Sequence, residues 1–150
     1  MTPLIGTLLL LALIGVSAII SLSEIAFAAA RDVRIRSLAE AGNKKALRFV
    51  ALRVKAGDVL TAMQIATNAV SILAGTLGED TLGPVFRSGL IATGLDPAAA
   101  GFVGSVLAFC LVTAAFVLFA DLTPKRVAML VPEDVALAMV WFPEIAVKVL

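Results

Sequence analysis

Three long apolar stretches constrain the fold of this chain more than any other feature. They run from Leu4 to Ile20, from Val59 to Gly78 and from Pro97 to Ala120, and the first continues past Glu24 to Ala30. A hydrocarbon layer of about 30 Å needs roughly 20 helical residues, so each stretch is long enough to cross it. The 61% hydrophobic content and the mean hydropathy of +1.05 are far above those of a soluble domain. We therefore predict an all-α integral membrane protein with three transmembrane helices, in which residues 1–150 form one transmembrane domain.

A signal peptide is the main alternative for the first stretch, because the stretch starts near Met1 and small residues follow it. It lacks a basic amino-terminal region, however, and its apolar core is too long for a signal peptide. We therefore favour a membrane span.

The charges are distributed unevenly along the chain. Eight of the twelve Lys and Arg residues lie between Arg31 and Lys55, against only Asp32 and Glu40. By the positive-inside rule this segment is expected in the cytoplasm. Three acids and one arginine lie at 79–96, which fits the opposite side. We therefore expect a multi-pass protein of a bacterial-type inner membrane, with its amino terminus outside and its carboxyl terminus in the cytoplasm.

Apolar residues recur among the charges of this basic segment at roughly helical spacing, and Ala41-Gly42-Asn43 interrupts the pattern. The pattern predicts a juxtamembrane belt of two amphipathic helices, whose Lys and Arg side chains pair with anionic lipid head groups. An electrostatic sensor, or a docking face for a cytosolic domain, is the functional alternative. Nucleic-acid binding is not expected, since the basic run lacks a series of interleaved aromatic residues.

The few polar residues within the apolar stretches are the candidates for binding. Glu24 is the only charge before Arg31, and an ionisable residue at membrane depth indicates a functional site. The second stretch places four polar residues at i, i+3, i+4 and i+7, and hence on one helix face: Gln64, Thr67, Asn68 and Ser71. Hydrogen bonds between helices are the structural alternative for such residues.

The third stretch ends in Ala120-Asp121-Leu122-Thr123-Pro124-Lys125. Pro124 has no backbone N–H and disfavours helix at the preceding residue, so we predict a broken backbone here. Freed carbonyls carry negative partial charge, and together with Asp121 they would form a seat for a cation. In the alternative interpretation, Asp121 marks the membrane edge and pairs with Lys125 or Arg126.

Three motifs, in this order along the chain, resemble the CNNM/CorC transmembrane family, whose bacterial members are called hemolysin-like or magnesium and cobalt efflux proteins. Ser21-Leu22-Ser23-Glu24-Ile25-Ala26 is similar to the family's Ser-Gly-Ser-Glu-Thr-Ala, at a kink of its first helix. Ile65-Ala66-Thr67-Asn68-Ala69-Val70-Ser71 resembles Ile-Gly-Asn-Asn-Leu-Val-Asn, and the motif at 120–125 resembles Gly-Glu-Ile-Leu-Pro-Lys. The segment at 36–43 also fits the family's cytoplasmic helix pair.

The resemblance implies a homodimer of three-helix modules, followed in longer relatives by cytosolic CBS domains that bind adenine nucleotide. It also implies a Mg2+ ion held between the helices by side-chain and backbone oxygens. Carried over to this sequence, the implied metal or substrate ligands are Ser21, Ser23, Thr67 or Asn68, Asp121 and the carbonyl of Ala120. The implied supporting or coupling residues are Glu24, Ser71, Pro124 and Lys125.

Three departures from the family pattern fall in this implied seat. Thr67 stands where the family has asparagine, Ala120 replaces glycine, and Asp121 is one methylene shorter than glutamate. Mg2+ requires near-octahedral oxygen ligands at about 2.0 to 2.1 Å, so these changes alter the seat. The variant motif resembles a branch of the family linked to export of organic polycations such as putrescine and cadaverine, and Glu24 and Asp121 could then serve two ammonium groups.

We therefore expect a cation exporter, with Mg2+ as the first candidate, a polyamine as the alternative, and a non-transporting membrane anchor or sensor as a further class. The sequence contains no Gly-x-x-x-x-Gly-Lys-Ser/Thr motif for ATP, so export would run on an ion gradient. Histidine is missing, which leaves Glu24 or Asp121 to carry a coupling proton. An enzyme is not expected, because no pair of nucleophile and base is evident.

Overall fold

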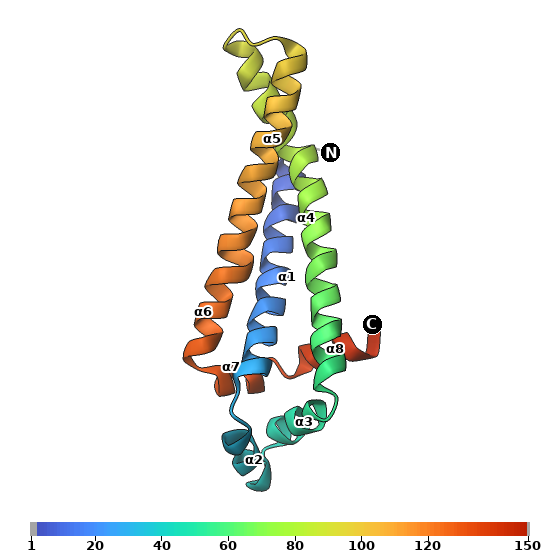
Figure 1. Cartoon of the computed structure of the whole chain (residues 1–150), viewed down its shortest axis with the longest axis vertical. Helices are drawn as coiled ribbons and strands as arrows, with labels where there is room; N and C mark the ends of the chain where they lie inside the picture. Colours follow the sequence, from blue (N-terminus) through green and yellow to red (C-terminus); the bar gives the residue numbers. More distant parts are fainter. Residues whose placement is uncertain (1–2, 150) are drawn as a thin grey trace.

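The computed structural model describes residues 3–149, and all regular secondary structure in that range is helical. Three of the described helices are long and apolar enough to cross a membrane. They are α1 (Pro3–Ala29), α4 (Ala56–Ala92), and a rod formed by α5 (Pro97–Ala115), η1 (Phe116–Leu122) and α6 (Thr123–Leu130). The predicted all-α fold with three long apolar helices is confirmed. Figure 1 shows α1 between the other two, with short helices gathered at one end of the bundle.

Helix α4 is longer than its apolar stretch. Its 37 residues extend about 55 Å at helical rise, which exceeds the hydrocarbon thickness of about 30 Å. The hairpin that joins α4 to α5 projects beyond the amino-terminal end of α1 (Figure 1). The sequence interpretation treated 79–96 as a connecting segment, whereas the structure continues α4 through Pro84 to Ala92. Asp96 then caps α5, its carboxylate accepting hydrogen bonds from the backbone N–H groups of Ala98 and Ala99.

Small residues let the long helices approach closely. A Cβ atom on Gly104 of α5 would lie 2.9 Å from the backbone nitrogen of Arg87 in α4. Gly78 of α4 leaves similar room for Val112. Between α1 and α4, the Thr81 side chain fills the space beside Gly6 of α1. These three contacts fix the register of the antiparallel helices.

The predicted backbone break at Pro124 is wrong. The third rod stays helical from α5 to α6, and its middle section η1 is a π-helix. A π-helix bonds from i to i+5, so the wider turn accommodates a proline that cannot donate a hydrogen bond. The Thr123 hydroxyl donates to the carbonyl oxygen of Leu118 at 2.7 Å and satisfies one acceptor in this turn. The rod ends only at Leu130. Helix α1 runs through Glu24 without interruption.

The amphipathic pair predicted in the basic segment is confirmed as α2 (Asp32–Glu40) and α3 (Lys44–Arg53). Asn43 caps α3 by accepting from the backbone N–H groups of Lys45 and Ala46. A second pair was not predicted: α7 (Pro132–Ala138) and α8 (Trp141–Val149). These two short helices lie across the same end of the bundle (Figure 1). We call α2, α3, α7 and α8 together the belt.

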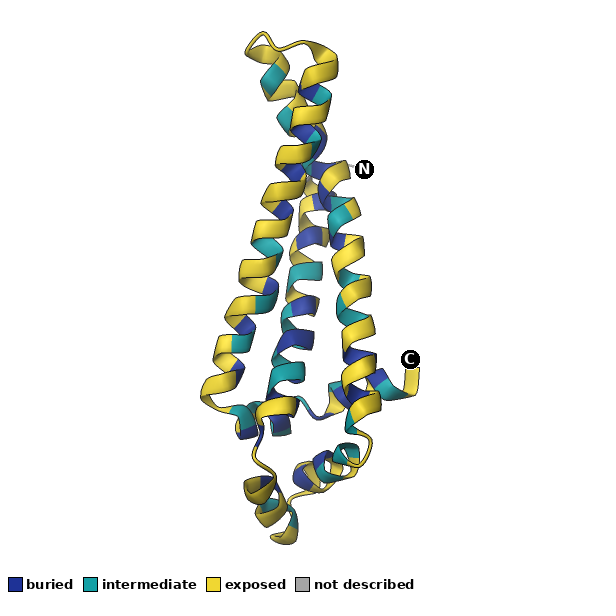
Figure 2. Cartoon of the chain, viewed as in Figure 1, coloured by how far each residue is buried: buried dark blue, intermediate teal, exposed yellow. Residues whose placement is uncertain are grey.

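The buried apolar side chains form two clusters at different heights. The larger cluster joins the belt end of α1, around Phe27, to Phe49 of α3 and Met63 of α4. The smaller one joins Leu10, Ala74 and Val112 in the other half of the bundle. Figure 2 shows that the outer faces of the long helices are mostly exposed, as expected for surfaces that meet lipid. Ser17, Ser21 and Ser23 lie on α1 between the two clusters.

Candidate functional site

A polar layer crosses the bundle between the two apolar clusters. Ser17, Ser21 and Ser23 of α1 are buried there, and Ser21 is 0% exposed. Ala120 of η1 is also fully buried. Buried hydroxyl groups in a membrane bundle are costly unless they bond to a neighbouring group or ligand. The layer is thus the place in the bundle where a polar ligand has partners.

Asp121 connects the third rod to α1 in this layer. The Ser21 hydroxyl points at the Asp121 carboxylate, with Oγ 3.4 Å from Oδ1, although 100 residues separate the two. The same Oδ1 atom lies 2.6 Å from the ammonium nitrogen of Lys125, one helical turn further along. The side chains of Asp121 and Lys125 are 41% and 31% exposed. The structure therefore brings together three predicted site residues around one oxygen atom.

Helix α4 contributes Thr67 at nearly the same height. Thr81 of α4 contacts Gly6 of α1, which gives a common reference point on the two helices. Thr67 lies 14 positions from Thr81 and Ser21 lies 15 positions from Gly6. At helical rise, Thr67 and Ser21 are therefore each about 21 to 23 Å from that contact. The Thr67 hydroxyl oxygen is buried and has no hydrogen-bond partner among the described residues. A buried hydroxyl without a partner costs free energy. Thr67 is therefore a candidate to contact a ligand in the layer.

The other predicted residues lie apart from this group. The Ser23 hydroxyl donates to the carbonyl of Ile19, and the Ser71 hydroxyl donates to that of Thr67, so both bond within their own helices. Asn68 is exposed, and the polar stripe on α4 is split because only Thr67 turns inward. Glu24 is partly buried on α1, and Pro124 is buried beside Lys125.

Few acidic side chains lie in the layer. No group of three acidic, histidine or cysteine side chains gathers anywhere in the described part of the chain. Asp121 is the acid in contact with Ser21, and its charge is already paired with Lys125. Mg2+ is usually held by carboxylates that bring net negative charge.

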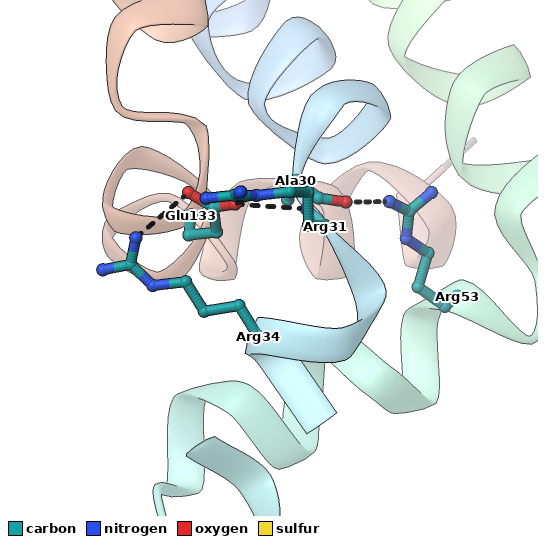
Figure 3. Close-up of polar contacts among 5 residues, drawn as sticks. All are labelled: Ala30, Arg31, Arg34, Arg53 and Glu133. Carbon is teal, nitrogen blue, oxygen red and sulfur yellow. Dashed lines mark hydrogen bonds and ion pairs between the residues drawn. The ribbon is translucent and has the colours of Figure 1, made fainter. Parts of the chain in front are cut away.

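The sequence did not predict an ion cluster around one buried carboxylate at the belt end. The carboxylate of Glu133, only 3% exposed, accepts from the guanidinium of Arg31 at 2.8 Å and lies 3.6 Å from that of Arg34 (Figure 3). The hydrogen bond from Arg31 lowers the pKa of Glu133 and raises that of Arg31. Only the charge complementarity between the basic segment and the acids after Pro132 could have indicated this pairing.

Arg53 secures the same junction from the other side. Its guanidinium donates to the carbonyl oxygen of Ala30 at 2.8 Å, as Figure 3 shows. It also lies 5.0 Å from the ring centre of Phe27 and 5.3 Å from that of Phe49. A guanidinium over aromatic rings is attracted to their faces. The belt is therefore fixed to the end of α1 rather than hinged freely below it.

A further ion pair links the two halves of the belt. Arg48 of α3 and Glu144 of α8 make a two-point contact, with Nε 2.7 Å from Oε1. The hydrogen bond from Arg48 lowers the pKa of Glu144. The sequence interpretation assigned the basic residues of this segment to lipid, whereas several of them pair within the protein.

The sequence is similar to a known protein family and to several curated proteins. The profile of the Cyclin M transmembrane N-terminal domain matches residues 8–150. A protein from Haemophilus influenzae named polyamine export protein is 39% identical over 133 residues, which is 89% of this chain and 31% of that protein. A protein of the same name from Escherichia coli K12 is 42% identical over 133 residues, 89% of this chain and 30% of the relative. The chain thus spans about a third of the length of these curated relatives.

Proposed function

The chain belongs to the Cyclin M transmembrane domain family, and on that premise we propose that it forms the membrane part of an exporter of organic polycations of the polyamine class. The observation that carries the proposal is the position of Asp121. Its carboxylate lies in the polar layer between two apolar clusters, faces a buried serine on α1, and has an alkylammonium group as its partner. Similar relatives named polyamine export protein support the same substrate class.

Ser21 and Asp121 would bind one ammonium group of the substrate, with Thr67 as a further acceptor. Ammonium groups donate three hydrogen bonds, and a carboxylate with two hydroxyls can accept them. Glu24 lies one turn along α1 from Ser21 and would meet the second ammonium group or carry a coupling proton. Ser23 and Pro124 would support the layer rather than bind the substrate, and Asn68 and Ser71 face away from it.

Mg2+ export remains a prediction and takes second place, because the carboxylate in the layer is paired with a lysine. A role as a membrane anchor or sensor is the remaining alternative. It draws support from the ion pair that ties the belt to the end of α1 and from the pair that links the two halves of the belt, since a regulatory domain could act through them. Such a CBS domain, and adenine nucleotide bound to it, would belong to a longer protein. No enzymatic step is proposed.

A second copy of the chain is the proposed partner within the membrane. Gln64, Asn68 and Ser71 are exposed on one face of α4, and polar side chains facing lipid are costly. Packing against a second copy would give the Gln64 and Asn68 amides hydrogen-bond partners, whereas the Ser71 hydroxyl already donates to the Thr67 carbonyl. The belt would lie at the cytoplasmic surface, where its remaining Lys and Arg residues meet anionic lipid, and the amino terminus would lie outside.

Binding by the purified protein tests the substrate class. Isothermal titration in nanodiscs would compare cadaverine, putrescine and Mg2+ on the same preparation. The proposal predicts saturable binding of the diamines that Asp121→Asn abolishes, and weaker or no binding of Mg2+. Saturable binding of Mg2+ with no response to either diamine would contradict it and favour the second candidate.

A further inference from the structure

The side-chain ammonium of Lys125 contacts the Asp121 oxygen that would accept a hydrogen bond from the substrate. Its Nζ atom is 2.6 Å from Oδ1 of Asp121, and Ser21 approaches that same oxygen from another helix. A lysine side chain is four methylenes ending in a primary ammonium, so it has the chemistry of one end of cadaverine or putrescine. The protein's own side chain therefore occupies the proposed binding position.

The pair is open on one side and can be exchanged. Ser21 is completely buried, whereas the Lys125 and Asp121 side chains are 31% and 41% exposed. The lysine stem rotates about several bonds, and an ion pair between neighbouring turns contributes little free energy. The backbone beside Lys125 is held by the buried Pro124. The ammonium can thus leave Asp121 without any change in the helix.

We propose that Lys125 is an internal competitor that holds the cation site when no substrate is bound and is displaced when an external ammonium enters. This deepens the proposed function and rests on it. The lysine keeps the Asp121 charge paired while no substrate is bound. It also lowers the affinity for substrate, which helps an exporter to release its cargo.

Diamine binding to a lysine variant tests the proposal. Lys125→Gln keeps most of the side-chain length and removes the ammonium, and the matched control is Arg126→Gln, which removes a positive charge from the exposed neighbouring position. Cadaverine is titrated into each purified protein in nanodiscs. We expect Lys125→Gln to lower the Kd about two- to fivefold, as displacement of a half-exposed ion pair implies, and Arg126→Gln to leave it unchanged. An equal or higher Kd for Lys125→Gln than for the wild type would overturn the proposal.

Two further variants separate the possible failures. Lys125→Arg retains the positive charge and can make a two-point contact with the carboxylate, so its Kd should equal or exceed that of the wild type. A lower Kd for Lys125→Arg would contradict the proposal, even if Lys125→Gln fails to fold. Asp121→Asn combined with Lys125→Gln should not bind. If neither the wild type nor Lys125→Gln binds cadaverine, the proposed function itself fails; if the wild type binds and Lys125→Gln gains nothing, only the competitor role fails.

Discussion

Arg31 and Glu133 form an ion pair across 102 positions of sequence, with the guanidinium Nε 2.8 Å from the carboxylate Oε1. The pair joins the start of the belt to the segment that follows the third rod (Figure 3). Because Glu133 is buried and Arg31 is exposed, the carboxylate depends on the arginines around it. The contact ties the end of α1 to the segment after the third rod, at one end of the bundle.

The pairing predicts a loss of stability in acid. The pKa of Glu133 is lowered in the folded protein by the hydrogen bond from Arg31. The contribution of Glu133 to the free energy of unfolding is therefore fully present above the ordinary carboxyl pKa of about 4.5. It is lost as the pH falls through the lower pKa of the folded protein. Thermal unfolding in detergent at pH 7 and at pH 3.5 would compare the wild type with Glu133→Gln. The wild type should melt at the higher temperature at pH 7, and the difference should shrink in acid. A difference in Tm that does not change with pH would contradict this account.

The contact between α4 and α5 predicts a cost for a single added methyl group. A Cβ on Gly104 would lie 2.9 Å from the Arg87 backbone nitrogen and 3.2 Å from the Gly83 carbonyl oxygen, and backbone atoms cannot move aside locally. Gly104→Ala should destabilise the protein by about 1 to 3 kcal/mol. The control is Gly89→Ala in α4, where a Cβ meets nothing within 4 Å. Because alanine has the higher helix propensity, this variant should be more stable than the wild type by at most about 1 kcal/mol. Equal Tm shifts for the two variants would show that the close approach is not limiting.

The unpaired hydroxyl of Thr67 predicts that stability and activity respond differently to one substitution. Thr67→Val removes a buried hydroxyl without a partner among the described residues, so the protein should be as stable as the wild type or up to about 1 kcal/mol more stable. Diamine binding should weaken, because the substrate loses an acceptor. Thr61→Val, at an exposed position of the same helix, is the control for the measurements of stability and of diamine binding. A destabilised Thr67→Val protein with normal binding would assign Thr67 to packing alone.

The sequence was sufficient to predict the three long helices and the α2–α3 pair, because each depends on local patterns: apolar length, charge, and the break before Asn43. It failed at Pro124, where the rule that proline ends a helix was overridden by the wider turn of η1. The length of α4 was not predicted for a related reason. Polar residues and Pro84 indicated a connecting segment, whereas the structure shows a helix that packs along α5.

The candidate site was predicted in part. Ser21, Asp121 and Lys125 do meet, but the inward turn of Thr67 and the outward position of Asn68 depend on how α4 rotates against its neighbours. The partners of Glu133 and Glu144 also depend on tertiary packing, because these pairs join residues about a hundred positions apart. No local pattern specifies which of several arginines an acid will meet.

Transport by an Asp121 variant tests the central claim most directly. Reconstituted vesicles loaded with labelled cadaverine would compare the wild type with Asp121→Asn, and with Asp134→Asn, which changes an exposed acid of α7 outside the polar layer. All three proteins must show the same helical content and insertion. We predict that Asp121→Asn abolishes cadaverine flux while Asp134→Asn retains it. Undiminished flux through correctly inserted Asp121→Asn protein would contradict the assignment of the polar layer as the cation path.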